Sequence, residues 1–143
     1  MTKQLSLIEK AFFLKKISIF SSLDLDLLIA IADKMNQDIY ESSENIFEKD
    51  QKASKIYFIV MGKVLLLDEK GNKINELKTE DSFGDEALFS EMPRGYSAIC
   101  KADTLFLTLS KTHLMTIISE CPTVAIALLQ LYAKNISSRH NEN

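Results

Sequence analysis

The sequence predicts an α+β fold: an antiparallel β-roll, a double-stranded jelly-roll-like barrel, flanked by N-terminal helices and two C-terminal helices. Three observations lead to this prediction. Helical periodicity is confined to the first and last thirds of the chain, short β-branched and aromatic segments fill the middle, and turn residues rather than helices separate them. Strands that follow one another in this way favour an antiparallel barrel or sandwich over a parallel sheet.

Length and composition place further limits on the protein. At 143 residues the chain has the size of one domain, which we expect over residues 1–143, and its 46% apolar share is enough for a packed core. The net charge of −3 and the scattered lysines argue against a nucleic-acid surface. Without a long apolar run or a signal-peptide pattern, we expect a cytoplasmic protein without membrane contact. Cys100 and Cys121 have no metal-ligand spacing and are expected to be reduced thiols, and no metal site is expected.

The first segment, residues 1–36, is expected to hold two helices. Ser22 or Asp24 is the predicted N-cap of the second helix, because both side chains can accept from the first free N–H groups. The apolar face of the first helix is expected to contain Leu5, Ile8, Phe12 and Leu14. That of the second is expected to contain Leu27, Leu28, Ile31, Ala32 and Met35.

The middle segment, residues 37–110, is expected to form the β-roll. Gly62 interrupts a long apolar run and predicts a bend or bulge between two strands. The polar segment DEKGNK predicts a hairpin turn, with Gly71 and Asn72 able to take a positive φ.

The last segment, residues 111–139, is expected to form two helices with a polar tail after them. The first is KTHLMTIISE, and Pro122 suits the first turn of the second. One face of the second helix is expected to contain Val124, Ala127, Leu128, Leu131 and Tyr132.

Residues 82–98, SFGDEALFSEMPRGYSA, differ from the strands on either side, with two of the four glycines and one of the two prolines of the chain. Gly84 allows a ligand or another backbone to come close, and the turn after it would present free N–H groups to an anion. Arg94 offers a planar fork that holds a phosphate with two parallel hydrogen bonds. Asp85 would repel a phosphate and is expected to accept from hydroxyls. The stretch therefore predicts a ligand with a phosphate beside a ribose hydroxyl.

This stretch resembles the phosphate-binding cassette of cyclic-nucleotide-binding domains of the catabolite activator and protein kinase A regulatory subunit type. The strand pair IYFIVMGKVLLL is also similar to that family, and the resemblance covers nearly the whole chain without a DNA-binding domain. It implies a non-catalytic bacterial sensor or regulatory module whose ligand is cAMP or cGMP, with no other cofactor. Because Gly95 rather than a hydroxyl residue follows Arg94, the resemblance favours cAMP. The residues that match the cassette are Phe83, Gly84, Ala87, Leu88, Pro93, Arg94, Gly95 and Ser97.

The resemblance also implies a role for each residue of the cassette. Arg94 would hold the cyclic phosphate, supported by the backbone N–H groups of Ala87 and Gly95. Gly84 would lie close to the ribose, and Asp85 stands where the family has a glutamate that accepts from the 2′-OH. The C-terminal helix would cover the base and transmit binding to a fused or partner effector. The candidates for that cover are Leu128, Leu131 and Tyr132.

Three residues depart from the family pattern. Asp85 is one methylene shorter than glutamate, and Glu86 puts a second carboxylate, in place of an apolar residue, near an anionic ligand. Tyr96 stands where a small residue is usual, and either packs over the barrel or fills part of the pocket. The turn EKDQKAS lacks the glycine that the family has there. The full set of predicted ligand-binding residues is Phe83, Gly84, Asp85, Glu86, Ala87, Leu88, Arg94, Gly95, Tyr96 and Ser97.

Other interpretations of these residues stay open from the sequence. Arg94 taken alone fits an ordinary surface arginine in a turn, and Asp85 and Glu86 fit carboxylates that complement a helix dipole. The main alternative function is a degenerate domain that acts as a protein-interaction or dimerisation module through the apolar face of its last helix. A small cupin-like barrel enzyme is a distant third, because the chain has no histidine cluster.

Overall fold

The computed structural model describes residues 4–141, and the side chains of residues 4–134. The chain forms two compact units: residues 4–5 with 34–111, and residues 6–33 with 112–141. The first unit contains all eight strands and one short helix, and the second contains the other four helices.

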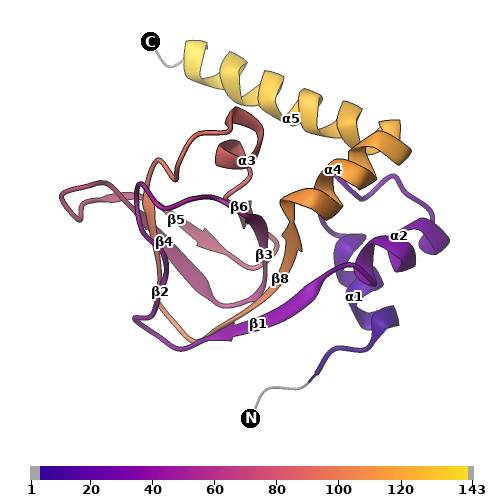
Figure 1. The fold of residues 1–143 in the computed structure, drawn as a ribbon, viewed down its shortest axis with the longest axis horizontal. Helices are drawn as coiled ribbons and strands as arrows, with labels where there is room; N and C mark the ends of the chain where they lie inside the picture. The colour runs from indigo at the N-terminus through magenta and orange to yellow at the C-terminus, as the bar shows by residue number, and fades with distance from the viewer. Residues whose placement is uncertain (1–3, 142–143) are drawn as a thin grey trace. The chain divides into compact units, whose positions relative to one another are not determined.

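The first unit is a β-roll of two antiparallel four-stranded sheets (Figure 1). One sheet has the order β1 (Asn36–Tyr40), β8 (Thr104–Ser110), β3 (Lys55–Met61) and β6 (Ser82–Phe83). The other has the order β2 (Asn45–Phe47), β7 (Ser97–Cys100), β4 (Lys63–Leu67) and β5 (Lys73–Lys78). The predicted β-roll, with helices before and after it in the chain, is confirmed.

The interior of the β-roll is aromatic and aliphatic. Side chains alternate across each strand, so β7 sends Ala98 and Cys100 inward, and both are buried. Tyr57 and Phe83 lie stacked, with ring centroids 5.0 Å apart, and Phe106 meets both rings edge-on. The core cluster consists of Phe47, Tyr57, Ile59, Val64, Leu66, Phe83, Ala98, Cys100 and Phe106.

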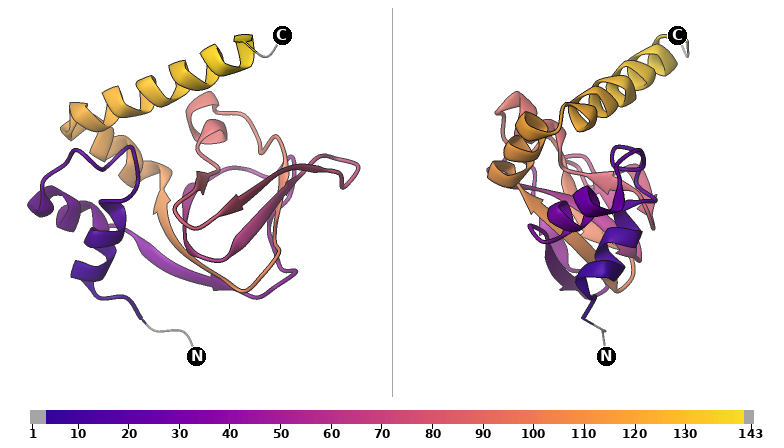
Figure 2. Two further views of the ribbon diagram at one scale, coloured as in Figure 1. Left: turned by 180° about the vertical axis from the view of Figure 1, so that it is seen from behind. Right: turned by 90° about the vertical axis from the view of Figure 1, so that its right-hand side faces the viewer.

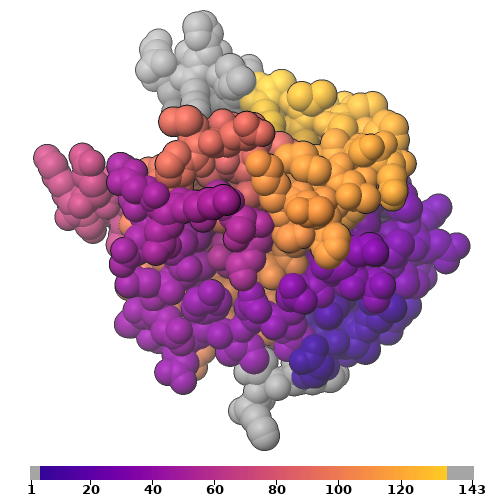
Figure 3. All heavy atoms as spheres, viewed as in Figure 1, coloured from indigo at the N-terminus to yellow at the C-terminus, as the bar shows by residue number. Residues whose placement is uncertain are grey.

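Gly62 is the point where the chain leaves one sheet and enters the other. It lies between β3 and β4 with a φ of +127°, and the pairing of β3 with β8 shifts register just before it. A Cβ atom at this position would lie 2.3 Å from the Thr104 Oγ1 atom, so the close approach also requires glycine. The predicted bend is confirmed. In the predicted hairpin, which projects from the β-roll (Figures 1 and 3), Gly71 takes the positive φ and Asn72 does not.

The two helices before the β-roll are confirmed, but the buried face of the first differs from the prediction. In α1 (Leu7–Leu14) the buried residues are Ala11, Phe13 and Leu14, whereas Phe12 is 57% exposed. Ile8, also predicted on the buried face, is 43% exposed. The α1 helix begins with a capping box on Ser6 and Glu9, which fixes its start.

The second of these helices, α2 (Leu25–Ala32), begins at Asp24, whose carboxylate accepts from the Leu27 N–H. This selects Asp24 over Ser22 as the N-cap. The helix buries Leu28, Ile31 and Ala32, and Met35 is buried just after it, but Leu27 is exposed, contrary to the prediction.

The helices after the β-roll are α4 (Lys111–Glu120) and α5 (Pro122–Asn141), separated by Cys121 as predicted (Figure 2). On the predicted face of α5, Val124 and Leu128 are buried. Ala127, Leu131 and Tyr132 on the same face are half-buried. The α5 helix continues to Asn141 and so includes residues 137–141 of the polar tail that was expected to follow it, whose side chains lie outside the described ones.

In the part of the chain that the structure describes, no single helix is long and apolar enough to cross a membrane. Only α4 and residues 122–134 taken together have that length and composition, and they are bent by 108°.

Substituting Gly62 tests the bend between the sheets. We expect Gly62→Ala to lower the free energy of unfolding by about 2 kcal/mol or more, because the new methyl group meets Thr104 at a positive φ. Gly71→Ala is the matched control, since it also has a positive φ but no atom within 4 Å of the new Cβ, and should cost about 1 kcal/mol. Urea unfolding measures both, and equal losses would contradict the steric role of Thr104.

Candidate functional site

The stretch 82–98 is anchored to the β-roll by the apolar residues of its first half. Phe83 in β6 is buried in the aromatic core, and the short helix α3 (Glu86–Ser90) buries Ala87 and Leu88. Asp85 is the N-cap residue of α3, and its carbonyl oxygen accepts from the Leu88 and Phe89 N–H groups. The predicted helical turn is therefore present.

Arg94 points into the protein. Its side chain belongs to a residue that is only 3% exposed, so the surface-arginine interpretation is wrong. The Nη2 atom donates to the Lys55 carbonyl oxygen at 2.7 Å, and Nη1 donates to the Gly84 carbonyl oxygen. The guanidinium group lies over the Phe47 ring, 4.2 Å from its centroid, and 6.0 Å from that of Tyr57. The direct contacts of this cation are therefore neutral carbonyl and aromatic groups.

Gly84 is required by the position of Arg94. Its φ is +89°, and a Cβ atom there would lie 2.9 Å from the Arg94 Nη1 atom. The sequence predicted that Gly84 would allow a close approach, and the group that approaches is the guanidinium group of Arg94. Any larger residue would push that group away from the carbonyl oxygens that hold it.

The turn at residues 48–51 holds the backbone of Arg94, which the sequence analysis did not predict. The Asp50 N–H donates to the Arg94 carbonyl oxygen at 2.7 Å, and the Arg94 N–H donates to the Gln51 carbonyl oxygen at 2.8 Å. Next to them, the Lys49 N–H donates to Ser97 Oγ at 2.9 Å. Asp50 has a φ of +76° and so replaces the glycine that this turn lacks. Aspartate tolerates a positive φ. Its presence at position 50 was the one feature of the sequence that pointed to a tight turn here.

The electrostatics of Arg94 follow from its burial. Burial lowers the pKa of the Arg94 guanidinium group, while Tyr57, Tyr96, Glu86 and Asp85 act through space to raise it. Arginine keeps its proton in proteins because its ordinary pKa is so high, so the group is a buried positive charge.

Tyr96 and Glu86 form a hydrogen-bonded pair beside Gly84. The Gly84 N–H donates to the Tyr96 hydroxyl oxygen at 3.2 Å, and the Tyr96 hydroxyl group is hydrogen-bonded to the Glu86 carboxylate. Burial and the negative charge of Glu86 raise the pKa of Tyr96, so it stays protonated and donates to Glu86. Burial also raises the pKa of the Glu86 carboxyl group, although the residue as a whole is exposed. Besides its place in the first turn of α3, Glu86 is therefore hydrogen-bonded to Tyr96.

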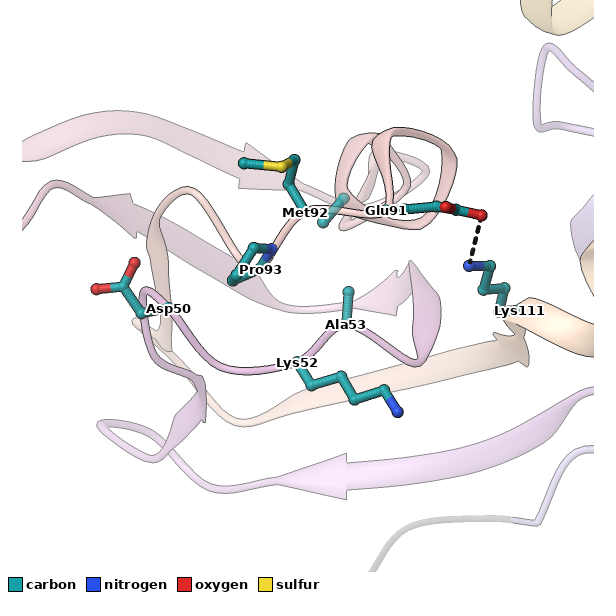
Figure 4. Close-up of a pocket in the computed structure, with 8 residues that line it drawn as sticks. Asp50, Lys52, Ala53, Glu91, Met92, Pro93 and Lys111 are labelled. Carbon is teal, nitrogen blue, oxygen red and sulfur yellow. Dashed lines mark ion pairs between the residues drawn. The ribbon is translucent and has the colours of Figure 1, made fainter.

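A cavity of about 260 Å³ lies beside the cassette (Figure 4). Its walls are the 50–53 turn, Ala87, residues 91–93 and Lys111. Glu91 and Lys111 form an ion pair across it, with 3.9 Å between the Glu91 Oε1 and Lys111 Nζ atoms. Arg94 is not among the residues that line it, because its side chain points to the interior of the β-roll.

The structure thus brings most of the predicted site residues to one end of the β-roll. Arg94 and Tyr96 both contact Gly84 and Glu86 is bonded to Tyr96, while Gly95 is exposed and Ser97 contacts the 48–51 turn. Cys100 and Cys121 are free thiols, the first buried and the second half-buried. Within the described residues, no group of three His, Cys, Asp or Glu side chains is placed to hold a metal ion.

Comparison with known proteins identifies the family. The sequence pattern of the family described as "Cyclic nucleotide-binding domain" matches residues 37–121, more than half of the chain. The chain therefore belongs to the cyclic nucleotide-binding domain family. It is 30% identical over 118 residues to the cGMP-dependent protein kinase egl-4 of Caenorhabditis briggsae, across 78% of this chain and 16% of that kinase.

Solved structures share the fold. The catabolite activator protein of Thermus thermophilus is similar with a TM-score of 0.79 and 24% identity, over 87% of this chain and 61% of that one. The regulatory subunit of a cAMP-independent protein kinase A from Trypanosoma brucei is similar with a TM-score of 0.75 and 20% identity, over 96% and 51%. The chain spans between 12% and 22% of the length of the curated relatives it matches.

Replacing Glu86 tests its raised pKa. Because the folded pKa lies above the ordinary value of 4.5, the free energy of unfolding should fall as the pH rises from that value through the folded pKa. Gln is neutral throughout this window and can still accept from Tyr96. We therefore expect Glu86→Gln to raise the melting temperature at about pH 7 but not at about pH 4.

The control for this prediction is Glu41→Gln, which changes an exposed glutamate in the turn between β1 and β2. Scanning calorimetry of the two variants at both pH values measures the effect. A pH-independent effect of Glu86→Gln, or an equal effect of Glu41→Gln, would show that Glu86 is an ordinary solvated carboxylate.

Proposed function

We propose that the chain is a regulatory module, without catalysis, that binds a cyclic nucleotide monophosphate through Arg94. One observation carries this proposal: Arg94 is a buried cation whose direct contacts are neutral. A desolvated charge interacts strongly with an opposite charge, and a planar guanidinium group is suited to two oxygens of one phosphate. Membership of the family indicates which phosphate, because the matched region contains the whole cassette.

Binding by Arg94 requires an exchange of partners. The guanidinium group would turn from the carbonyl oxygens of Gly84 and Lys55 to the cyclic phosphate, while the Asp50 and Gln51 backbone bonds keep the position of its main chain. The charge-assisted bonds to phosphate are stronger than those to neutral carbonyl groups, which favours the exchange. Ala87 and Gly95 would add backbone N–H groups, and Asp85 would accept from the ribose.

We favour cAMP over cGMP as the ligand. The residue after Arg94 is Gly95, which has no hydroxyl group to offer to a guanine. The relatives do not decide between the bases, because the Caenorhabditis kinase is named for cGMP and the regulatory subunits of Debaryomyces hansenii and Candida albicans for cAMP.

The same exchange offers a route for transmitting binding to the C-terminal helices. Lys55, whose carbonyl oxygen accepts from Arg94, pairs with Ser110 at the end of β8. The next carbonyl oxygen towards the N-terminus, that of Ser54, accepts from the Lys111 N–H, and Lys111 is the first residue of α4. Release of Lys55 by Arg94 would loosen the start of α4, and a ligand that binds one arrangement better would shift the population between them. A fused or partner effector, or a second copy in a homodimer, would read this change.

The second candidate is a protein-interaction module without ligand. Two observations favour it: side chains of the protein itself fill the contacts of the cassette, and the α5 helix exposes Ile126 (54%) and Leu129 (67%). These exposed residues lie outside the apolar face that was predicted as the interface, because Val124 and Leu128 of that face are buried. In this case Ile126→Ser with Leu129→Ser would abolish the interaction, and Arg94→Ala would leave it unchanged.

Titration calorimetry with cAMP and then cGMP tests the proposed function. We expect saturable binding that Arg94→Ala weakens by about tenfold or more, because a phosphate loses charge-assisted hydrogen bonds. Arg94→Lys, which keeps the charge but loses the fork, should bind with intermediate affinity. Lys52→Ala is the control, because it removes a cation from the wall of the neighbouring cavity.

Folding must be checked in these variants, because Arg94→Ala leaves the carbonyl oxygens of Gly84 and Lys55 without their donor. Circular dichroism and thermal unfolding provide this check. If the folded wild-type protein takes up neither nucleotide, or if the folded Arg94 variants bind as the wild type does, the proposal is wrong.

A further inference from the structure

The two residues that most disturb the cassette pattern are in contact with each other. Glu86 replaces an apolar residue and Tyr96 replaces a small one, and their side chains are joined by a hydrogen bond. The same Tyr96 hydroxyl group also accepts from the Gly84 N–H at 3.2 Å. The two substitutions therefore act as one unit, and this unit closes on the glycine that also contacts Arg94.

The bonding pattern of the Tyr96 hydroxyl group is that of a sugar hydroxyl in a binding site. A hydroxyl group can accept one hydrogen bond and donate another, and Tyr96 does both, from a backbone N–H and to a carboxylate. A ribose hydroxyl of a bound nucleotide would seek the same two kinds of partner. The tyrosine thus occupies the Gly84 N–H, which a ribose hydroxyl would otherwise reach, and it holds the Glu86 carboxylate next to Asp85.

The ring of Tyr96 lies at the mouth of the β-roll interior. Tyr96 precedes β7 with the same parity as Ala98 and Cys100, the residues that β7 directs inward, and it packs against the core cluster. Its ring centroid is 5.7 Å from that of Phe47, the ring that also carries the Arg94 guanidinium group. Tyr96 and Arg94 are therefore held at neighbouring places on one aromatic surface.

We propose that Tyr96 is an affinity-determining residue of the cassette: its hydroxyl group is an internal competitor for the Gly84 N–H, close to which the ribose of a cyclic nucleotide would lie. This proposal rests on the proposed function. A ligand binds after the Tyr96 hydroxyl group has left the Gly84 N–H and Glu86. The free protein is thereby kept closed at low ligand concentration, and the cost of displacing Tyr96 sets the concentration at which the module responds.

Two substitutions separate the hydroxyl group of Tyr96 from its ring. Tyr96→Phe keeps the ring on Phe47 but removes the hydroxyl group, so we expect the affinity for the nucleotide to rise about three- to tenfold, the equivalent of one or two net hydrogen bonds. Tyr96→Ser introduces a small residue and removes the ring as well, and should raise the affinity at least as much. Tyr40→Phe is the matched control, because Tyr40 packs on the same core cluster, edge-on to Phe106, away from the cassette.

A second measurement reports on the proposed contact independently of affinity. The chain has four glycines, so labelling with ¹⁵N-glycine yields four backbone amide signals. The Gly84 signal should lose its hydrogen-bond shift in Tyr96→Phe, and should move when nucleotide is added to the wild type. It should stay in place in Tyr40→Phe.

The outcomes separate this proposal from the proposed function. Tighter binding by Tyr96→Phe that still depends on Arg94 supports both. Binding that is seen only after Tyr96 is replaced supports the blocking role of Tyr96 but overturns the proposed function of the wild-type chain. Binding that depends on Arg94 but is unchanged or weaker in both folded Tyr96 variants overturns the role of Tyr96 and leaves the proposed function intact. No binding by the wild type or by either Tyr96 variant, all folded, overturns both.

Discussion

The buried positive charge of Arg94 is the constraint on which the rest of the site depends. A charge removed from water is costly unless polar groups surround it, and here carbonyl oxygens of two segments and the faces of two aromatic rings do so. Because those groups come from β2, β3 and the β6–α3 connection, one side chain holds together segments that are far apart in the sequence. Gly84 is glycine because Arg94 needs the space, and Asp50 takes a left-handed conformation because its N–H must reach the backbone of Arg94.

Two of the departures from the family pattern, Glu86 and Tyr96, are explained by their contact with each other. Glu86 alone would lack the hydroxyl group that donates to it, and Tyr96 alone would have the Gly84 N–H as a donor but no acceptor for its own proton. Together they form a pair in which the tyrosine donates and the carboxylate accepts. The apolar anchors of the cassette, Phe83, Ala87 and Leu88, are buried, and its arginine is held by the carbonyl oxygens of Gly84 and Lys55.

The same contacts connect the site with the start of the C-terminal helices. The carbonyl oxygens of Ser54 and Lys55, at the start of β3, accept from the Lys111 and Arg94 N–H groups, so the arginine and the first residue of α4 share one short piece of backbone. Lys55 also pairs with Ser110, the last residue of β8, directly before α4.

The sequence by itself determined the order of helices and strands, the bend at Gly62, the start of α5 at Pro122 and the identity of the cassette, because periodicity, glycine, proline and spacing are local signals. It did not determine that Arg94 points inward onto Phe47, that Asp50 and Gln51 hold its backbone, or that Glu86 and Tyr96 bond to each other. These contacts join residues that lie 10 to about 47 positions apart, and only the closing of the two sheets brings them together. The buried face of α1 was also missed, because the residues that turn inward are set by what the helix packs against, here α2, and not by apolar spacing alone.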